Sequence, residues 1–318
     1  MAYDVLVIGD SSIDQYLELE SVEIHEDLKM KQPEICFVHG SKVPVKTFAS
    51  TLAGNACHVA VGLQRLNINT AIYTELGEDQ NGSRFIEKYK SYGINTHLCR
   101  QNKGVDTNVH TIIWGKGDRT IFSYHYPYKY EVEFTKLPQI SWVFYTSLAD
   151  GFETFQADLV KYLNANPSIG LAFNPGTYHM RAGTGKLLNV LKRTDILFVN
   201  REEAYAIIGL STGLSAAQTE LHEKLQKLGP KKTVITNGKH GSSASDGESY
   251  EEMPIIKVAE PIVDKTGAGD AFAAAFMAAI YYKKSLKEAL LWGTKNSASI
   301  VKCVGCIDGL LTKKEITS

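Results

Sequence analysis

The stretch Asp264-Lys265-Thr266-Gly267-Ala268-Gly269-Asp270 runs directly into Ala271-Phe272-Ala273-Ala274-Ala275-Phe276-Met277-Ala278-Ala279-Ile280. Two glycines before a run of strong helix formers predict a tight turn at the N-terminus of a helix. The free N–H groups and the dipole of such a terminus favour an anion. Asp270 places a carboxylate in the same turn, and an anion site beside a base indicates phosphoryl transfer. The alternative is a plain helix with an acidic first turn.

Composition sets the broad class of the chain. The 318 residues are 44% hydrophobic and 22% charged, with a formal net charge of -1. These values are typical of a globular protein with a large core, and they give no sign of a nucleic-acid or membrane partner. No apolar run approaches the roughly 18 residues of a membrane span, and the N-terminus lacks a signal-peptide pattern, so we expect a cytoplasmic protein. Five scattered cysteines, Cys303 and Cys306 among them, favour reduced thiols over disulfides.

The order of the predicted elements indicates an α/β fold. The apolar run 4–9 predicts a buried parallel strand, and the sequence that follows lacks the GxGxxG of a dinucleotide site. From residue 137 onward, predicted strands and helices alternate, which implies a mostly parallel sheet covered on both faces. Residues 16–48 and 106–128 instead show the alternation of half-exposed strands, with a hairpin signal in the second stretch. We expect these two segments to pair as a discontinuous β lid, with 1–15, 49–105 and 129–318 forming an α/β catalytic domain.

Several short motifs, taken together and in order, carry a resemblance to a known family. They are Gly9 with Asp14, Gly54-Asn55-Ala56, Gly77-Glu78-Asp79-Gln80-Asn81-Gly82, Asn200-Arg201-Glu202-Glu203, Thr236-Asn237-Gly238-Lys239-His240-Gly241 and Asp264 to Asp270. The set resembles the ribokinase-like (PfkB-type) carbohydrate kinases over nearly the whole chain. Lys265 stands where that family usually has Thr.

The resemblance implies a three-layer ribokinase-like fold with a β lid, and transfer of the γ-phosphoryl group of ATP to a hydroxymethyl oxygen. Asp270 would be the base toward that hydroxyl, and the backbone of Gly267, Ala268 and Gly269 would form the anion hole. The implied cofactors are ATP and Mg²⁺, with K⁺ as a candidate.

Site residues follow from the same resemblance. Asp14, Gly54, Asn55 and His58 would bind the acceptor, although Asp14 could instead be a turn residue. Ala53 replaces the first glycine of the family's pair, and His58 stands where Asn is usual. The residues expected on the ATP side are Asn200, Thr236, Gly238, Gly241 and Asn296. Glu203 would act on Mg²⁺ through water, or simply favour a helix start, and Asp264 and Thr266 are placed for a monovalent cation.

The predicted function is therefore an ATP-dependent kinase of a small sugar. A nucleoside kinase is the alternative on the same fold. A sugar-phosphate kinase is disfavoured because no dense Arg/Lys cluster accompanies the acceptor turn, although Lys29, Lys31, Lys42 and Lys46 lie in the lid segment. A non-catalytic sugar- or nucleotide-binding protein would not need Asp270. An exposed apolar lid face and edge strand would favour a homodimer through the lid.

Overall fold

The computed structural model describes residues 2–20, 24–26, 33–115, 118–210, 216–258, 265–302, 305, 307 and 309–318. The predicted features at Lys29, Lys31, Asp264, Cys303 and Cys306 lie outside these ranges.

An eight-stranded sheet forms the centre of the larger part of the molecule, in the order β16-β15-β14-β13-β12-β11-β1-β6. Strands β6 to β14 in this order are parallel, and β15 and β16 continue the sheet antiparallel. The strands are β1 (Tyr3–Ile8), β6 (Thr70–Tyr73), β11 (Ile140–Tyr145), β12 (Gly170–Phe173), β13 (Ile196–Asn200), β14 (Lys232–Thr236), β15 (Ser242–Ser245) and β16 (Tyr250–Met253).

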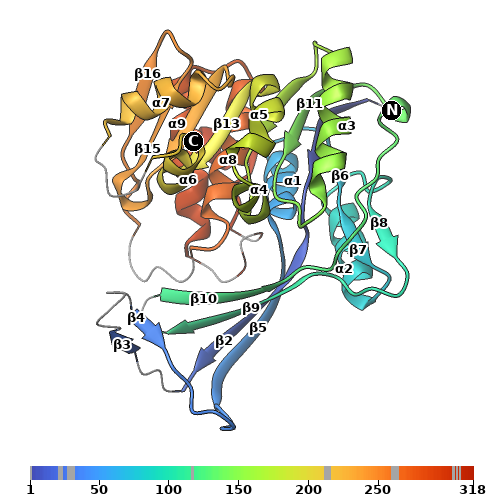
Figure 1. The fold of residues 1–318 in the computed structure, drawn as a ribbon, viewed down its shortest axis with the longest axis vertical. Coiled ribbons are helices and arrows are strands. Elements are labelled where there is room, and N and C mark those ends of the chain that lie inside the picture. Colours follow the sequence, from blue (N-terminus) through green and yellow to red (C-terminus); the bar gives the residue numbers. More distant parts are fainter. Residues whose placement is uncertain are drawn as a thin grey trace.

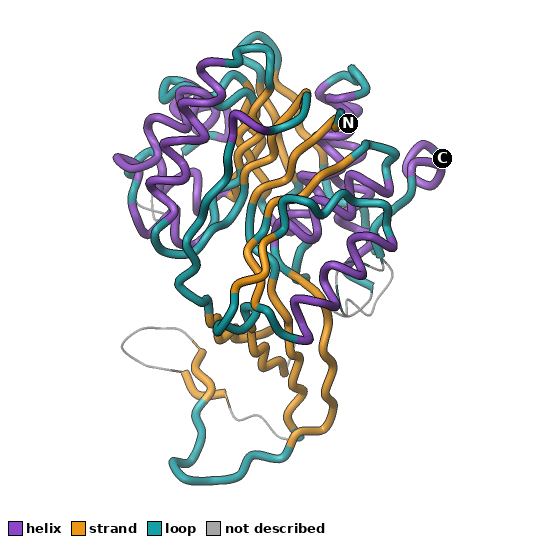
Figure 2. The backbone as a smooth tube through the Cα atoms, turned by 90° about the vertical axis from the view of Figure 1, so that its right-hand side faces the viewer, coloured by secondary structure: helices purple, strands orange, loops and turns teal. Residues whose placement is uncertain are grey.

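Helices cover both faces of this sheet (Figure 2). The helices are α1 (Asn55–Arg65), α2 (Gln80–Ser91), α3 (Phe152–Ala165), α4 (Thr177–Ala182), α5 (Thr184–Arg193), α6 (Arg201–Ile207), α7 (Gln218–Gln226), α8 (Ala268–Tyr281), α9 (Leu286–Ile300), α10 (Lys313–Thr317) and the 3-10 turns η1 (Phe134–Lys136) and η2 (Gly238–His240). Val5 and Val7 of β1 pack in the cluster that contains α1, α8 and α9, whereas Leu6 and Ile8 pack in the cluster that contains α3, α5, α6 and α7. This alternation explains why the strand is a continuous apolar run, because both of its faces are buried.

A four-stranded sheet extends below the main body, in the order β10-β9-β2-β5 (Figure 1). Its strands are β2 (Ser12–Leu19), β5 (Val45–Ala53), β9 (Val109–Gly115) and β10 (Asp118–Tyr124). The two predicted half-exposed segments therefore pair with each other, through the parallel contact of β2 with β9. Two small two-stranded sheets complete the fold, β3 (Ile24–Glu26) with β4 (Pro33–Ile35) and β7 (Glu75–Gly77) with β8 (Arg100–Asn102).

The fold class predicted from the sequence is confirmed. Residues 72–77 read as one strand in the sequence but are divided between two strands, β6 and β7, which belong to different sheets. Strand β15 was not expected, because Ser242-Ser243-Ala244-Ser245 lacks an apolar pattern although all four residues are buried. None of the helices in the described part of the chain is both long enough and apolar enough to cross a bilayer.

Candidate active site

The N-terminal turn of α8 opens on the carboxyl ends of the main-sheet strands. Gly267 is the N-cap and adopts a left-handed conformation with φ 74°, which favours glycine. A Cβ built on Gly269 would meet no atom within 4 Å, so space is open directly beside the first turn. The geometry leaves room for an anion against the helix terminus, as the sequence predicts.

Asp270 lies in this first turn and is only 8% exposed. The Asn55 Nδ2 group donates a hydrogen bond of 3.0 Å to Asp270 Oδ1. His58 Nδ1 lies 3.5 Å from Asp270 Oδ2. Asn55 and His58 both belong to α1, so this helix holds the carboxylate from a point far away in the sequence.

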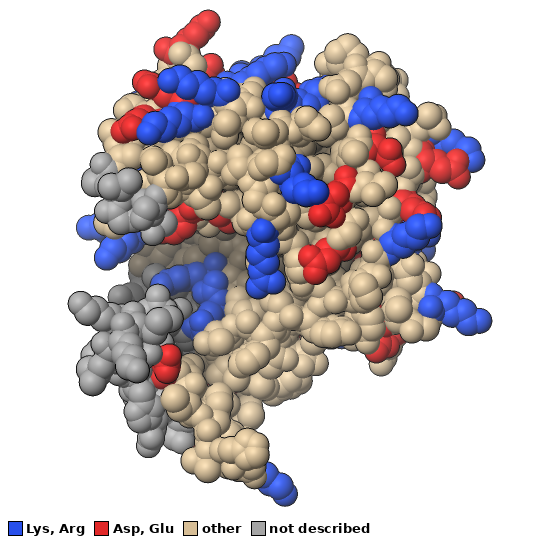
Figure 3. Space-filling view, viewed as in Figure 1, with Lys and Arg blue, Asp and Glu red and all other residues tan. Residues whose placement is uncertain are grey.

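A cavity of about 240 Å³ connects Asp270 with the strand ends. Its lining includes Asn55, Ser147, Asn174, Pro175, Gly176, Thr177, Phe198, Val199, Asn200, Glu203, Val234, Thr236, Lys265, Gly267, Ala268, Gly269, Asp270 and Phe272. Figure 3 shows a hollow on this face of the molecule, between the main body and the small sheet. The predicted catalytic residues and three of the predicted ATP-side or metal residues thus share one cavity.

Asn200 and Glu203 form a capping box at the start of α6. The Glu203 N–H donates to Asn200 Oδ1 at 2.8 Å, and the Asn200 N–H donates to Glu203 Oε2 at 2.9 Å. Burial raises the pKa of Glu203 to about 7, with the Asp270 charge adding to the shift and the Asn200 hydrogen bonds opposing it. Glu203 therefore caps the helix and also lines the cavity.

The remaining residues predicted on the ATP side fall into two groups. Thr236 lines the cavity, and Gly238 and Gly241 form the following turn with φ of 50° and 91°. A Cβ on Gly241 would lie 2.2 Å from the Met253 carbonyl oxygen, so only glycine fits there. Asn296, in contrast, is fully buried, donates to the Ala271 carbonyl at 2.7 Å and accepts from the Leu311 N–H at 2.8 Å. Its amide ties α9 to α8, and it is absent from the described lining of the cavity.

On the acceptor side, Gly54 packs directly on the chain that follows β1. It has φ 98°, and its Cβ would lie 2.6 Å from the Asp10 carbonyl oxygen. Asp14, only 3% exposed on β2, accepts from Ser12 Oγ at 3.2 Å and lies 3.2 Å from His110 Nδ1. The turn that carries Asn55 is thus fixed against the segment that carries Asp14.

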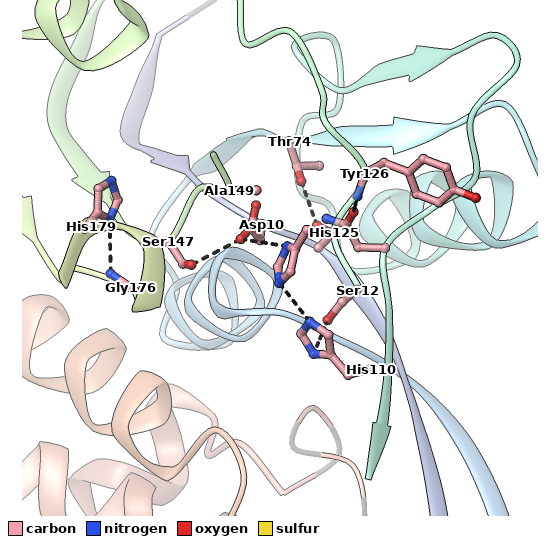
Figure 4. A network of polar contacts seen from close by, with 12 residues as sticks. Asp10, Ser12, Thr74, His110, His125, Tyr126, Ser147, Ala149, Gly176 and His179 are labelled. Atoms are coloured by element: carbon pink, nitrogen blue, oxygen red, sulfur yellow. Dashed lines mark hydrogen bonds and ion pairs between the residues drawn. The ribbon is translucent and has the colours of Figure 1, made fainter. Parts of the chain in front are cut away.

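Sequence reasoning missed four polar residues of this region: Asp10, His110, His125 and Ser147. Figure 4 shows His125 between Asp10 and His110, with Ser147 pointing at Asp10. One signal was present in the sequence: Asp10 directly follows a buried strand, where parallel sheets present ligand residues. The shared face of His110 and Asp14 follows from the pairing of β9 with β2 in the structure.

Two described residues, Thr266 and Glu203, were predicted to take part in metal binding. Thr266 lies half-buried in the turn before α8. Within the described ranges, no three His, Cys, Asp or Glu side chains gather closely enough to hold a metal ion. Glu203 is thus the acidic residue that could act on Mg²⁺ from the α6 side of the cavity, and magnesium takes few protein ligands because it keeps several waters.

The chain belongs to the pfkB family of carbohydrate kinases, because the model of that family matches residues 20–313. An ATP-dependent 6-phosphofructokinase of Thermoanaerobacterium thermosaccharolyticum is 26% identical over 96% of this chain and 90% of its own length. A nucleoside kinase of Methanocaldococcus jannaschii is 23% identical over 81% of this chain and 82% of its own length. The protein is accordingly a carbohydrate or nucleoside kinase, a phosphotransferase, as the sequence predicts.

Solved structures agree on the fold. Arabidopsis thaliana ribokinase complexed with ribose and ATP matches with a TM-score of 0.81 at 20% identity, over 100% of this chain and 98% of that one. A putative Escherichia coli ribokinase II in complex with ATP and Mg²⁺ matches with a TM-score of 0.78 at 18% identity, over 99% and 98% of the two chains. The fold is ribokinase-like, and kinases of this family use ATP with Mg²⁺.

Proposed function

We propose that the protein transfers the γ-phosphoryl group of ATP to a hydroxymethyl oxygen of a small sugar. The observation that carries this proposal is the position of Asp270. Its carboxylate lies in the first turn of α8, is held by Asn55, and opens on a cavity whose wall is the backbone of Gly267, Ala268 and Gly269. A base and an anion-binding helix terminus therefore face the same small space.

In the proposed reaction, the acceptor hydroxyl gives its proton to Asp270 while its oxygen attacks the γ-phosphorus. The bond from phosphorus to the bridging oxygen breaks, and ADP leaves. The free N–H groups at the start of α8 would stabilise the charge on the transferring group, since a helix terminus is preorganised for an anion. The Ala268 N–H also donates to the Lys265 carbonyl, at 3.3 Å. Mg²⁺, when bound, neutralises charge on the phosphate oxygens, and Glu203 would hold it through water.

The supporting residues have matching roles. Asn55 and His58 orient Asp270, Asp14 and the Gly54 turn bind the acceptor, and Asn200, Thr236, Gly238 and Gly241 accommodate the nucleotide. Asn296 supports this site indirectly by holding α9 on α8. Thr266, together with Asp264 outside the described residues, remains the candidate monovalent-cation site.

The direct test is Asp270→Asn. We expect kcat to fall by about 10²–10⁴, the usual contribution of a positioned base, while ATP still binds. Asp158→Asn, on the exposed surface of α3, is the matched control and should keep full activity. Near-normal turnover of Asp270→Asn, measured as ADP release, would contradict the proposal.

A nucleoside is the second candidate acceptor, since the M. jannaschii nucleoside kinase aligns with most of the chain. Parallel assays of ADP release with free sugars and with nucleosides separate the two candidates. A protein that binds both classes, shown by thermal shift, without releasing ADP from either would instead be a binding protein.

The outer face of the small sheet supports the proposed homodimer. Phe48, Phe122 and Tyr124 are 62%, 55% and 56% exposed there, on the face opposite to Asp14. Exposed apolar area of this kind favours association. We expect a dimer by light scattering at micromolar concentration, shifted toward monomer by Phe48→Ser with Phe122→Ser; a monomeric wild-type chain would exclude it. A cytoplasmic location fits the same proposal.

A further inference from the structure

Two carboxylate–histidine pairs meet where the small sheet joins the main body. Asp14 Oδ1 lies 3.2 Å from His110 Nδ1, and Asp10 Oδ2 lies 3.7 Å from His125 Nδ1. The two imidazoles contact each other, with 3.2 Å between their Nε2 atoms. The result is a row of polar groups from Asp10 to Asp14, which we call the histidine wall (Figure 4). The 3.7 Å between Asp10 and His125 is too long for a hydrogen bond, so among the described residues His125 Nδ1 has no hydrogen-bond partner.

The histidine wall combines residues from both parts of the molecule. Asp10 follows β1 of the main sheet, Asp14 and His110 lie on paired positions of β2 and β9, and His125 follows β10. Ser147 donates to Asp10 Oδ2 at 3.1 Å and also lines the cavity that contains Asp270. The wall therefore continues the lining of the proposed reaction site toward the small sheet.

The histidine wall consists of imidazole and carboxyl groups and carries no fixed positive charge. Burial lowers the pKa of His125 to about 4, so near neutral pH this imidazole is uncharged. Its Nε2 faces His110, and its Nδ1 is left to bond a ligand. Burial raises the pKa of Asp10 to about 7, against the effect of Ser147 and His110. Such groups form hydrogen bonds with hydroxyl groups, whereas a phosphate group would be repelled by the two carboxylates.

In the described part of the chain, arginines lie near the wall but do not pair with its carboxylates. No lysine or arginine there forms an ion pair with Asp10 or Asp14, and Lys46 is paired with Glu18 at 2.8 Å. Arg119 shares a face with Asp14, but its row is four residues further along β2, about 13 Å away at roughly 3.3 Å per residue. Arg181 stacks on Tyr178, whose ring has its centroid 5.3 Å from that of His125.

We propose that the histidine wall binds the acceptor through its hydroxyl groups and selects an unphosphorylated polyhydroxy compound over its phosphate ester. This inference rests on the proposed kinase function and narrows its substrate class. It separates this chain from the T. thermosaccharolyticum relative, which by its name acts on a sugar phosphate. A site built to bond hydroxyls through buried polar groups discriminates strongly, because a mismatched ligand leaves those groups unpaired.

The first test compares matched pairs: ribose with ribose 5-phosphate, fructose with fructose 6-phosphate, and cytidine with its monophosphate. We expect at least one unphosphorylated member to be used with kcat/KM about 100-fold or more above its phosphate ester, a difference within reach of such sites. A preference for phosphate esters that disappears in Arg119→Ala or Arg181→Ala would overturn the inference while leaving the kinase function intact. If no compound is phosphorylated, the proposed kinase function fails. The selection of the acceptor is then tested separately by calorimetric titration without ATP, and tighter binding of a phosphate ester than of its unphosphorylated partner would overturn it.

The second test changes the wall itself. His110→Asn and His125→Asn should each raise the acceptor KM by about 10–100-fold, the loss expected for hydrogen bonds at a buried site, with the KM for ATP changed less than about twofold. His97→Asn, an exposed histidine before β8, is the control and should change neither constant. Thermal melting checks that the variants fold. Equal effects on both KM values, or none on the acceptor KM of either variant, would overturn the assignment.

Discussion

The two larger sheets of this molecule differ in what covers their faces. The residues proposed for phosphoryl transfer lie at one sheet, and those proposed to select the acceptor lie at the other. The eight-stranded sheet is covered by helices on both faces, so its strand ends are fixed and present Asn200 and Thr236 to the cavity, with Glu203 beside them in the first turn of α6. The four-stranded sheet turns one face to the hollow and the other, with Phe48 and Phe122, outward. The rigid layer thus carries the proposed phosphoryl-transfer groups, and the layer packed on one side would contribute to the proposed recognition of the acceptor.

The largest expected effect compares the two sheets directly by stability. Phe144 in β11 is fully buried and stacks on Phe198 with ring centroids 5.8 Å apart. Phe144→Ala should lower the free energy of unfolding by about 3–5 kcal/mol, because it leaves a cavity in the core. Phe122→Ala, on the exposed face of the small sheet, should cost within about 0.5 kcal/mol. Urea unfolding at low protein concentration measures both, and equal costs would remove the distinction.

An intermediate effect concerns the junction between the sheets. Asn55 follows β5 of the small sheet and holds Asp270 of the main body at 3.0 Å. Asn55→Ala should reduce kcat by about 10–100-fold, because the base loses the hydrogen bond that orients it. Steady-state kinetics checks this, with Asn164→Ala on the exposed surface of α3 as the control. Full activity of Asn55→Ala would mean that His58 alone suffices to position the carboxylate.

The last effect is a dependence of folding stability on pH, and it arises from Glu203 in the main body. The pKa of Glu203 is raised from 4.5 to about 7 in the folded protein, so the folded state binds this proton more tightly than the unfolded chain. Its stabilisation is complete below pH 4.5 and is lost as the pH rises through about 7.

The variant Glu203→Gln keeps a capping side chain but cannot titrate. Between about pH 5 and 8, wild type should lose on the order of 1–3 kcal/mol more stability than this variant. Glu202→Gln, at the exposed neighbouring position, should follow wild type in the same urea titrations. Parallel curves for all three proteins would show that Glu203 is ionised throughout.

The sequence predicts the main sheet better than the acceptor region, for physical reasons. Apolar runs such as 4–9 and the Ala-rich helix after Asp270 are strong local signals, and their elements are found where expected. The contact of Asn55 with Asp270 joins residues far apart in the chain, so no local pattern in the sequence predicts it. The approach of His125 to Asp10 depends on how the small sheet docks on the main body, and no local pattern encodes that docking.

The parallel pairing of β2 with β9 has a consequence for the order in which the chain folds. Ile13 pairs with Val109, and α1, β6 and α2 lie between them in the sequence. Closing so long a loop costs entropy that is recovered only when the intervening segment is compact. We therefore expect the small sheet to assemble late, after β1, α1 and β6 have packed. A newly made chain would then complete the core around β1, α1 and β6 before the residues of the proposed acceptor site come together.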